Sequence, residues 1–367
     1  MPAPLGAACP LEPLPMTAAC ADVITACRVP VPHVVDVMPG GTRLRVQTNS
    51  LALAQALNRH FAAFPGDGGQ PDLVVQAVDG PNPDLDLAFV PHESEGGKEE
   101  YADLPDGRLV RKRRTGLLLV FGPAGNWIFG PCAAWPQQVV NALNARLADR
   151  ELARGAALLH AAAVARGEAA LALAGLAGAG KTTLALELVR RGADFVTNDR
   201  LFVTPEPNGF GCCGVARPPR VNPGTILGND RLHGLLDPVE RAAYAALPPD
   251  ALWGLESKHD VPIETCFGPG RVRLRAGLRA LVVLCWKRGG GPVVAHRTTL
   301  AAAPELVPAI AKDLGVLFLA GPCPADPAAY LAALGELPVL ALSGGTDVSH
   351  AAQLCQDILC RADGCPP

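Results

Sequence analysis

This sequence lacks a strong excess of charge of either sign, with a net charge of −3 and an isoelectric point of about 6.2. Such a balance gives no electrostatic reason to expect binding to nucleic acid or to anionic membranes. Long apolar runs are missing too, because Arg166 and Glu168 interrupt the best candidate for a membrane span. No basic segment followed by an apolar one opens the chain as a secretory signal would. We therefore expect a soluble, cytoplasmic protein with neither nucleic-acid nor membrane partners.

Paired metal-binding cysteines are also absent. None of the twelve cysteines belongs to a Cys-x-x-Cys pair, and the adjacent Cys212 and Cys213 are badly placed to share a metal ion. Cys355, Cys360 and Cys365 recur every five residues, yet no histidine or second cysteine cluster supports a metal site there. We interpret the cysteines as reduced thiols that behave as small apolar side chains.

Apolar residues, in contrast, are plentiful and make up 49% of the 367 residues. A chain of this length favours about two domains. Glycine and proline punctuate apolar segments and do not form low-complexity tracts, so we do not expect global disorder. The expected organisation is a loosely ordered leader over residues 1–30, a smaller α/β domain over residues 31–150, and a nucleotide-binding domain over residues 151–367.

One motif is far more specific than the rest. It follows the Walker A pattern, a glycine, four residues and then Gly-Lys-Thr, and it runs Gly175-Leu176-Ala177-Gly178-Ala179-Gly180-Lys181-Thr182-Thr183. Glycines let successive backbone N–H groups point inward as an anion-binding nest, and the following helix adds its positive N-terminal end. In such a loop Lys181 reaches the outer phosphates, and the Thr182 hydroxyl is a ligand of Mg²⁺.

The flanks of this motif have the order that a phosphate-binding loop requires. Upstream, residues 169–174 form an apolar run typical of a buried strand. Downstream, leucines and Val189 indicate a helix, and Gly192 marks its C-terminal end. The alternative is a flexible loop in an alanine-rich protein. The order of strand, turn and helix favours the phosphate loop, and we predict that the chain binds a nucleoside triphosphate.

Asp199 is the candidate carboxylate for this site. It lies about one helix and one strand beyond Lys181, which would return the chain to the strand beside the phosphate loop. Phosphoryl transfer needs a carboxylate that holds a metal ion or accepts a proton. The alternative for Asp199 is an ordinary turn residue in an Asn-Asp pair.

Periodicity predicts further elements along the chain. In the first half we expect strands at 42–47, 72–78 and 85–90, a helix over 51–64, a loop over 91–106, two paired strands at 108–114 and 117–121, and a helix over 135–150. In the second half we expect a helical region over 232–247, strands at 271–275, 281–286 and 339–342, and helices over 301–314 and 348–360. The basic run from Arg111 to Arg114 is either a docking surface for an acidic partner or, as we prefer, a solvated edge strand.

Several segments resemble a known family. The segments 158–164, 175–183 and 188–199 resemble the kinase domain of bacterial HPr kinase/phosphorylase, in which a strand with a histidine precedes the phosphate loop. The segments 197–201, 218–225 and 252–261 resemble, more closely, the HPr kinase-related kinase B family. This resemblance implies a mixed-sheet, phosphoenolpyruvate carboxykinase-like P-loop fold that uses ATP and Mg²⁺. In the parent family the acceptor is a serine of a small protein, and the subunits assemble as homo-oligomers.

The resemblance also carries roles to individual residues. Lys181 and Thr182 match the residues that handle phosphate and metal, and His160 matches the histidine beside the active site. Asp199 matches the second acid of a pair, whose expected role is to accept the proton of the attacking hydroxyl. Asn198 replaces the first acid, so its carbonyl would still ligate metal but without charge.

Other residues leave alternatives open. Glu256 is either a substitute for the family's further metal-binding glutamate or a surface partner of Lys258. Arg217 and Arg220 either clamp an anionic group or are solvated loop charges, and Trp253 and Trp286 are core or interface residues. For the whole protein, a kinase acting on a small protein, a kinase acting on a small molecule, and a non-catalytic ATP sensor all remain.

Overall fold

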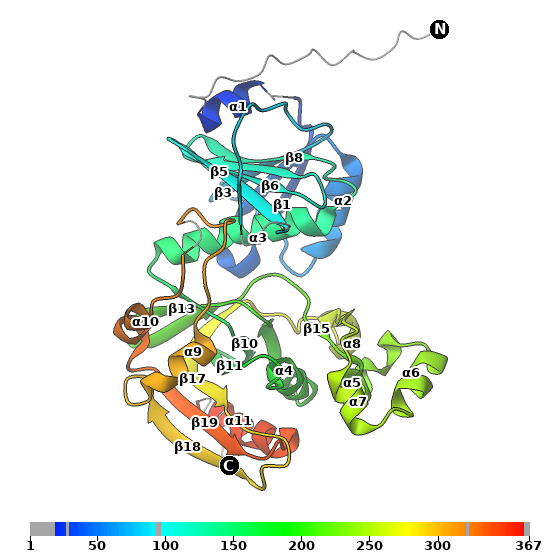
Figure 1. The fold of residues 1–367 in the computed structure, drawn as a ribbon, viewed down its shortest axis with the longest axis vertical. Coiled ribbons are helices and arrows are strands. Elements are labelled where there is room, and N and C mark those ends of the chain that lie inside the picture. The colour runs from blue at the N-terminus through cyan, green and yellow to red at the C-terminus, as the bar shows by residue number, and fades with distance from the viewer. Residues whose placement is uncertain (1–18, 27–28, 93–96, 321–322, 363–367) are drawn as a thin grey trace. The chain divides into compact units, whose positions relative to one another are not determined.

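The computed structural model describes residues 19–26, 29–92, 97–320 and 323–362 (Figure 1). The chain divides into two compact units. The first unit comprises residues 1–38, 42–149 and 314–323, and the second comprises residues 39–41, 150–313 and 324–367. Both units are mixed α/β structures. Within the described residues, no helix combines the length and the apolar character that crossing a membrane requires.

The first unit is built on one eight-stranded mixed sheet. Its elements are α1 (Cys20–Ala26), β1 (His33–Val37), β2 (Leu44–Thr48), α2 (Leu51–His60), β3 (Leu73–Asp79), β4 (Val90–Pro91), β5 (Glu99–Leu104), β6 (Gly107–Lys112), β7 (Leu118–Gly122), β8 (Gly125–Gly130) and α3 (Pro136–Ala153). The strand order is β1-β2-β3-β8-β7-β6-β5-β4. The pairs β2–β3 and β3–β8 are parallel, and all other pairs are antiparallel.

The second unit holds a nine-stranded mixed sheet and a two-stranded one. Its strands are β9 (Ala157–Leu159), β10 (Ala162–Arg166), β11 (Ala169–Gly175), β12 (Asp194–Thr197), β13 (Leu201–Glu206), β14 (Gly209–Cys213), β15 (Arg220–Val221), β16 (His259–Asp260), β17 (Arg275–Leu284), β18 (Val293–Thr299) and β19 (Pro338–Gly344). Its helices are η1 (Pro39–Gly41), α4 (Lys181–Arg190), α5 (Pro223–Leu227), η2 (Asp230–Leu235), α6 (Pro238–Ala245), α7 (Pro249–Gly254), α8 (Ile263–Phe267), η3 (Pro304–Leu306), α9 (Val307–Ile310), α10 (Pro327–Leu334) and α11 (Val348–Ala362).

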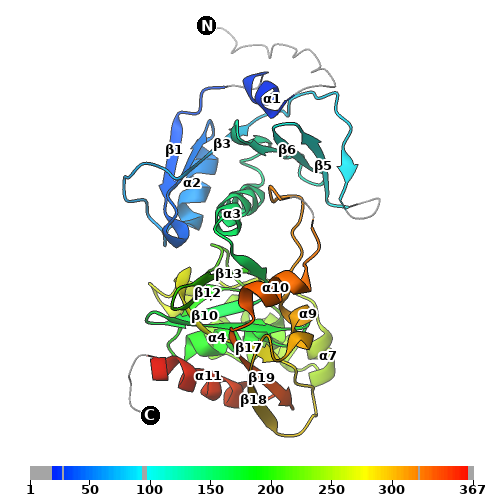
Figure 2. The same cartoon turned by 90° about the vertical axis from the view of Figure 1, so that its left-hand side faces the viewer.

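Strand β11 lies deep within the larger sheet. It pairs antiparallel with β10 and parallel with β17, and the residues of β11 are all buried. Leu171 and Leu173 belong to a core cluster with α4 and α11, whereas Ala170 and Ala172 belong to a cluster with α9 and α10. The sheet is therefore covered on both faces, with α11 on one side and α9 and α10 on the other (Figure 2). Burial on both faces explains why β11 is an unbroken apolar run.

Several predicted elements are confirmed. The predicted helices over 51–64, 135–150 and 348–360 correspond to α2, α3 and α11, and the predicted strands at 72–78 and 339–342 correspond to β3 and β19. The two strands predicted to pair are β6 and β7, with Arg108 opposite Phe121. Strand β11 and helix α4 flank the glycine-rich loop in the predicted order.

Four predicted elements are wrong. Residues 85–89 form no strand, although Leu85, Leu87 and Phe89 alternate, because they pack on the core without a partner strand. The predicted loop over 91–106 contains β5. The predicted strand at 271–275 begins only at Arg275. The predicted helix over 301–314 is reduced to η3 and α9, because Pro304 and Pro308 each remove a backbone donor.

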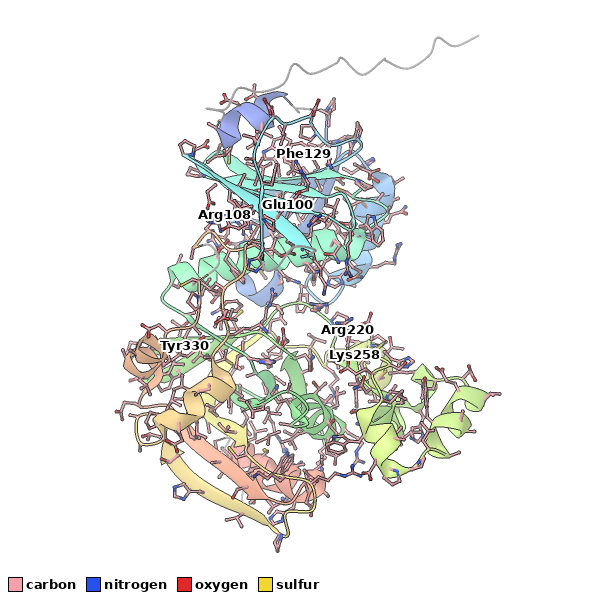
Figure 3. The ribbon with its side chains drawn as sticks, in the orientation of Figure 1. Glu100, Arg108, Phe129, Arg220, Lys258 and Tyr330 are labelled. Atoms are coloured by element: carbon pink, nitrogen blue, oxygen red, sulfur yellow. The ribbon has the colours of Figure 1, made fainter. Side chains whose placement is uncertain are left out.

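Two other interpretations of the first unit need correction. The leader expected over residues 1–30 lies partly outside the described residues, and the described part contains α1, whose Cys20 and Val23 are buried in the core. The basic run is not an edge strand, because β6 lies between β5 and β7. Glutamates of β5 pair with its cations: Arg111 with Glu100 at 2.9 Å, and Lys112 with Glu99. Figure 3 labels Glu100 and Arg108 in this part of the sheet.

Candidate functional site

The glycine-rich loop connects the end of β11 to the start of α4 and contains three glycines with positive φ, Gly175, Gly178 and Gly180. Gly175 has φ of 148°, and a Cβ there would lie 2.9 Å from the carbonyl oxygen of Leu284. Gly180 has φ of 89° and is the residue before the first turn of α4. L-residues rarely adopt such conformations, so the curl of the loop depends on glycine at both positions. Leu176, Ala177 and Gly178 are exposed, which leaves the crest of the loop open to a ligand.

Lys181 lies beneath this loop and is 9% exposed. Its Nζ donates hydrogen bonds to the carbonyl oxygens of Gly175 at 2.8 Å and Leu176 at 3.3 Å. Burial lowers the pKa of Lys181, the charge of Lys312 lowers it further, and Asp199 opposes both effects. The ammonium group is thus anchored to the loop that it would serve, and it lies within electrostatic reach of a second lysine and a carboxylate.

Trp286 supports the same loop from below. It is 8% exposed and follows β17, and its Nε1 donates a hydrogen bond to the carbonyl oxygen of Ala179 at 2.8 Å. A buried indole N–H needs a partner, and here the partner is the backbone of the loop itself. The prediction of a core role for Trp286 was correct, but that prediction contained no contact with the loop.

The first turn of α4 is tied to two neighbouring segments by hydroxyl groups. Thr182 Oγ1 donates to Asn198 Oδ1 at 2.6 Å. The hydroxyl of Thr183 bonds that of Thr225, in α5, at 2.8 Å. Three of the predicted site residues, Lys181, Thr182 and Asn198, therefore lie together at the start of α4.

Strand β12, which leads to Asn198 and Asp199, was predicted beside the phosphate-loop strand, and this prediction is wrong. β12 pairs with β10, so β10 separates it from β11. The turn after β12 is closed by Thr197, whose Oγ1 donates to the carbonyl oxygen of Arg200 at 2.9 Å and accepts from Val215 N at 3.5 Å. Asn198 still reaches Thr182, because the hydrogen bond between their side chains spans the distance from the turn after β12 to α4.

Three basic side chains lie around the carboxylate of Asp199. His160 Nε2 lies 3.2 Å from its Oδ1, Lys312 Nζ lies 3.0 and 3.1 Å from its two oxygens, and Arg200 Nε lies 4.0 Å away. Burial raises the pKa of Asp199, but the hydrogen bonds and charges of His160 and Lys312 outweigh it and hold that pKa well below its ordinary range. Asp199 is therefore ionised at neutral pH.

His160 and Lys312 reach Asp199 from two segments that are joined backbone to backbone. His160 follows directly after β9, and its N–H donates to the carbonyl oxygen of Ile310 at 2.7 Å. Leu159 and Ala311 form an isolated antiparallel bridge. Tyr330, in α10, adds a clamp, because its hydroxyl accepts from Lys312 N at 3.1 Å and donates to the carbonyl oxygen of Leu158.

Neither a protein-family profile nor a curated protein matches this chain. Among solved structures, the Hpr(Ser) kinase/phosphatase from Coxiella burnetii is similar over 56% of this chain and 93% of that chain. The identity is 11% and the TM-score is 0.30. A TM-score of this size does not establish a shared fold.

Oxygen atoms are the ligands that this site offers to a metal ion. Thr182, Asn198 and Asp199 supply a hydroxyl, an amide oxygen and a carboxylate, and in the described residues no cluster of three or more histidines, cysteines or acidic residues is found. This set does not suit a zinc ion. It fits Mg²⁺, which binds one or two protein oxygens, phosphate oxygens and water.

Residues whose roles were left open fall into two groups. The side chain of Glu256 is 76% exposed and pairs with Lys258 at 3.6 Å, as expected of a surface pair. Arg217 is different, because its electrostatic neighbours include Arg200, Arg220 and Asp199. Arg220 lies on β15, opposite Asp260, and Figure 3 labels it with Lys258 at this small sheet. Arg217 and Arg220 thus form a basic margin beside Asp199.

Lys312 and Tyr330 are the residues that sequence reasoning missed. Lys312 lies more than a hundred residues beyond Asp199, in a segment expected to be helical. One signal was available, since lysine is scarce beside arginine in this chain and each lysine is correspondingly informative. Tyr330 gave no signal, because an aromatic residue on an apolar helix is typical of a core position.

Proposed function

We propose that the second unit binds ATP with Mg²⁺ and transfers the γ-phosphate to a hydroxyl group. One observation carries this proposal: the glycine-rich loop with its anchored Lys181 and the ionised Asp199 lie within electrostatic reach of each other. A phosphate cradle and an adjacent carboxylate are the two protein components that phosphoryl transfer requires. The resemblance of the sequence to HPr kinase-related kinases is consistent with this chemistry and suggests a serine of a small protein as the acceptor.

The phosphate chain would lie along residues 175–183. Backbone N–H groups of the loop and the N-terminal end of α4 would bind the inner phosphates, and Lys181 the outer ones. Thr182, Asn198 and Asp199 would hold Mg²⁺, which offsets charge on the phosphate oxygens when bound. Trp286 would keep the loop in its curled form through Ala179.

Asp199 would then serve the acceptor. It accepts the proton of the attacking hydroxyl as the oxygen forms a bond to the γ-phosphorus and the bond to the β-γ bridging oxygen breaks, leaving ADP. His160, at 3.2 Å, orients the carboxylate. The basic margin of Arg217 and Arg220 would attract a phosphate or an acidic acceptor.

Asn198 favours one alternative, a nucleotide sensor without turnover. An uncharged amide in place of a carboxylate weakens the attraction for Mg²⁺, while Thr182 already occupies its oxygen. A small-molecule kinase is the other alternative, because acceptor choice depends on loops with no recognisable pattern. Self-association remains an expectation from the resemblance alone.

The test is transfer of labelled γ-phosphate from ATP with Mg²⁺ to serine-bearing small proteins and, separately, to sugars and other metabolites. We expect labelled product with the wild type and none with Lys181→Ala. Transfer that survives Lys181→Ala would refute the assigned roles. Tight ATP binding without turnover, with turnover created by Asn198→Asp, would identify the sensor.

A further inference from the structure

Lys312 spans both oxygens of Asp199, with Nζ–Oδ distances of 3.1 and 3.0 Å. The side chain of Lys312 is 23% exposed and that of Asp199 is 48% exposed, so the pair faces an open site. Both hydrogen bonds of Nζ that the structure contains go to this one carboxylate, although an ammonium group has three donors.

The backbone of Lys312 is held in place, whereas its side chain is long and flexible. Lys312 N bonds the Tyr330 hydroxyl at 3.1 Å, and Ala311 bridges Leu159. The ammonium group is therefore delivered to the site by a fixed segment. From that position it can change partners by rotating side-chain bonds, without any movement of the sheet.

Two ammonium groups interact with the carboxylate of Asp199, that of Lys312 through two hydrogen bonds and that of Lys181 electrostatically. His160 also bonds this carboxylate. The charge of Lys312 lowers the pKa of Lys181, so the two ammonium groups lie within electrostatic reach of each other. An anion with several charges can pair with both ammonium groups at once. When Lys312 moves away from Asp199, His160 still bonds the carboxylate.

We propose that Lys312 is a catalytic residue that exchanges Asp199 for the γ-phosphate of the bound nucleotide. Nζ pairs with Asp199 in the nucleotide-free protein and with the terminal phosphoryl group in the ATP complex. The exchange adds a second cation to the transferred group and frees a carboxylate oxygen for the acceptor hydroxyl. This inference rests on the proposed function, because it requires a triphosphate in the loop of residues 175–183.

The proposed contact of Lys312 is with the γ-phosphate, which ADP lacks, so comparing a triphosphate with ADP tests this contact specifically. Calorimetry with Mg²⁺ would compare ADP with the β,γ-imido analogue of ATP, for the wild type, Lys312→Met and Lys312→Arg. Because a charge-assisted hydrogen bond contributes strongly, we expect Lys312→Met to weaken the triphosphate analogue by about ten- to a hundredfold and ADP by less than about twofold. Lys312→Arg should restore part of the lost affinity. Lys98→Met, at an exposed lysine of the first unit, is the matched control and should change neither affinity.

Equal weakening of both nucleotides, or no weakening of either, would overturn the role of Lys312 and leave the proposed function intact. Failure of the wild type to bind the triphosphate analogue would instead refute the proposed function. Thermal unfolding of each variant reports whether it is folded. If Lys312→Met does not fold, the ratio of triphosphate to diphosphate affinity is measured for Lys312→Gln, and Lys312→Arg should again restore part of the loss. For transfer itself, we expect Lys312→Met to lower kcat with little change in the KM of the acceptor.

Discussion

Asp199 is the residue at which the electrostatics of the second unit converge. His160 and Lys312 both bond its carboxylate, and they lower its pKa even though burial acts in the opposite direction. Substituting one member of such a pair leaves the charge of the other without its partner, so we expect single substitutions here to have large effects. Phosphate transfer and ATP affinity should respond differently.

Replacing Asp199 with asparagine separates these two effects. We expect Asp199→Asn to reduce phosphate transfer by about 10²- to 10⁴-fold, the usual contribution of a general base. ATP affinity measured without Mg²⁺ should be unchanged or higher, because a negative charge beside the phosphates is removed. Rates of transfer and calorimetric affinities measure the two quantities. Asp84→Asn, at an exposed position of the first unit, is the matched control. Loss of ATP binding in a folded Asp199→Asn protein would contradict this role.

Buried thiols make the stability of the chain sensitive to alkaline pH. Burial raises the pKa of Cys355, in α11, to about 12, and its side chain is fully buried. In the unfolded chain a thiol ionises near pH 8.5. The contribution of this group to stability is therefore complete below about pH 8.5 and is lost as the pH rises toward 12.

We expect Cys355→Ala to reduce this alkaline loss. At about pH 7 the variant should be less stable than the wild type by about 1 kcal/mol, because a small cavity replaces the sulfur. At about pH 10.5 the wild type loses up to about 3 kcal/mol through this thiol, so the difference should shrink or reverse. Urea denaturation under reducing conditions at both pH values measures the free energy of unfolding. A constant difference across the two pH values would show that the thiol does not contribute in this way.

At the scale of elements, the glycine-rich loop depends on β17 as much as on its own glycines. Trp286 lies two residues beyond the end of β17, and its indole N–H donates a hydrogen bond to the carbonyl oxygen of Ala179. The nearest backbone to Gly175 is Leu284, at the end of the same strand. The loop is thus positioned by a parallel neighbour of β11 that lies about a hundred residues further along the chain.

Trp286→Phe tests this support. It removes the bond to the Ala179 carbonyl and keeps the ring in the core. We expect a loss of about 1 kcal/mol in the free energy of unfolding and several-fold weaker ATP binding, since one buried acceptor loses its partner. Trp253→Phe, at an exposed tryptophan of α7, is the control and should change neither quantity by a similar amount. Unchanged ATP binding in Trp286→Phe would show that the loop keeps its shape without the indole.

Local features were predictable at this scale, and non-local ones were not. The strand and the helix flanking the loop follow from periodicity and glycine placement, both of which lie within about twenty residues. The position of β10 between β11 and β12 depends on strand pairing, which periodicity does not encode. The basic run of β6 was wrongly predicted at an edge for the same reason. Its partners Glu99 and Glu100 belong to another strand, and periodicity does not show which strands pair. Lys312 is positioned near Asp199 by long-range contacts, among them the bridge between Leu159 and Ala311.

At the scale of the whole molecule, residues 314–323 belong to the first unit although the segments on both sides belong to the second. Arg108, on β6, donates to the carbonyl oxygen of Phe318 at 2.9 Å, and Arg146, on α3, donates to that of Leu317. Leu319 N donates to Asp149 at 3.0 Å. Burial lowers the pKa of Arg146 to about 10, because its guanidinium is removed from water. Nothing in the composition of the segment indicated such a role.

The first unit should therefore not be stable when cut out as a continuous piece. We expect a fragment of residues 19–153 to unfold at a lower temperature than the first unit of the intact chain, because a buried guanidinium loses the carbonyl that it bonds. Circular dichroism during heating measures both transitions, and addition of a peptide of residues 314–323 should raise the transition of the fragment. A fragment as stable as the intact chain, with no response to the peptide, would contradict this account.

Calorimetric titration with ATP and Mg²⁺ shows whether the loop of residues 175–183 holds a triphosphate through Lys181. We expect saturable binding to one site of the wild type and an affinity lower by about ten- to a hundredfold or more for Lys181→Ala. Absence of heat and of a thermal shift in folded wild-type protein, or equal binding by Lys181→Ala, would contradict it.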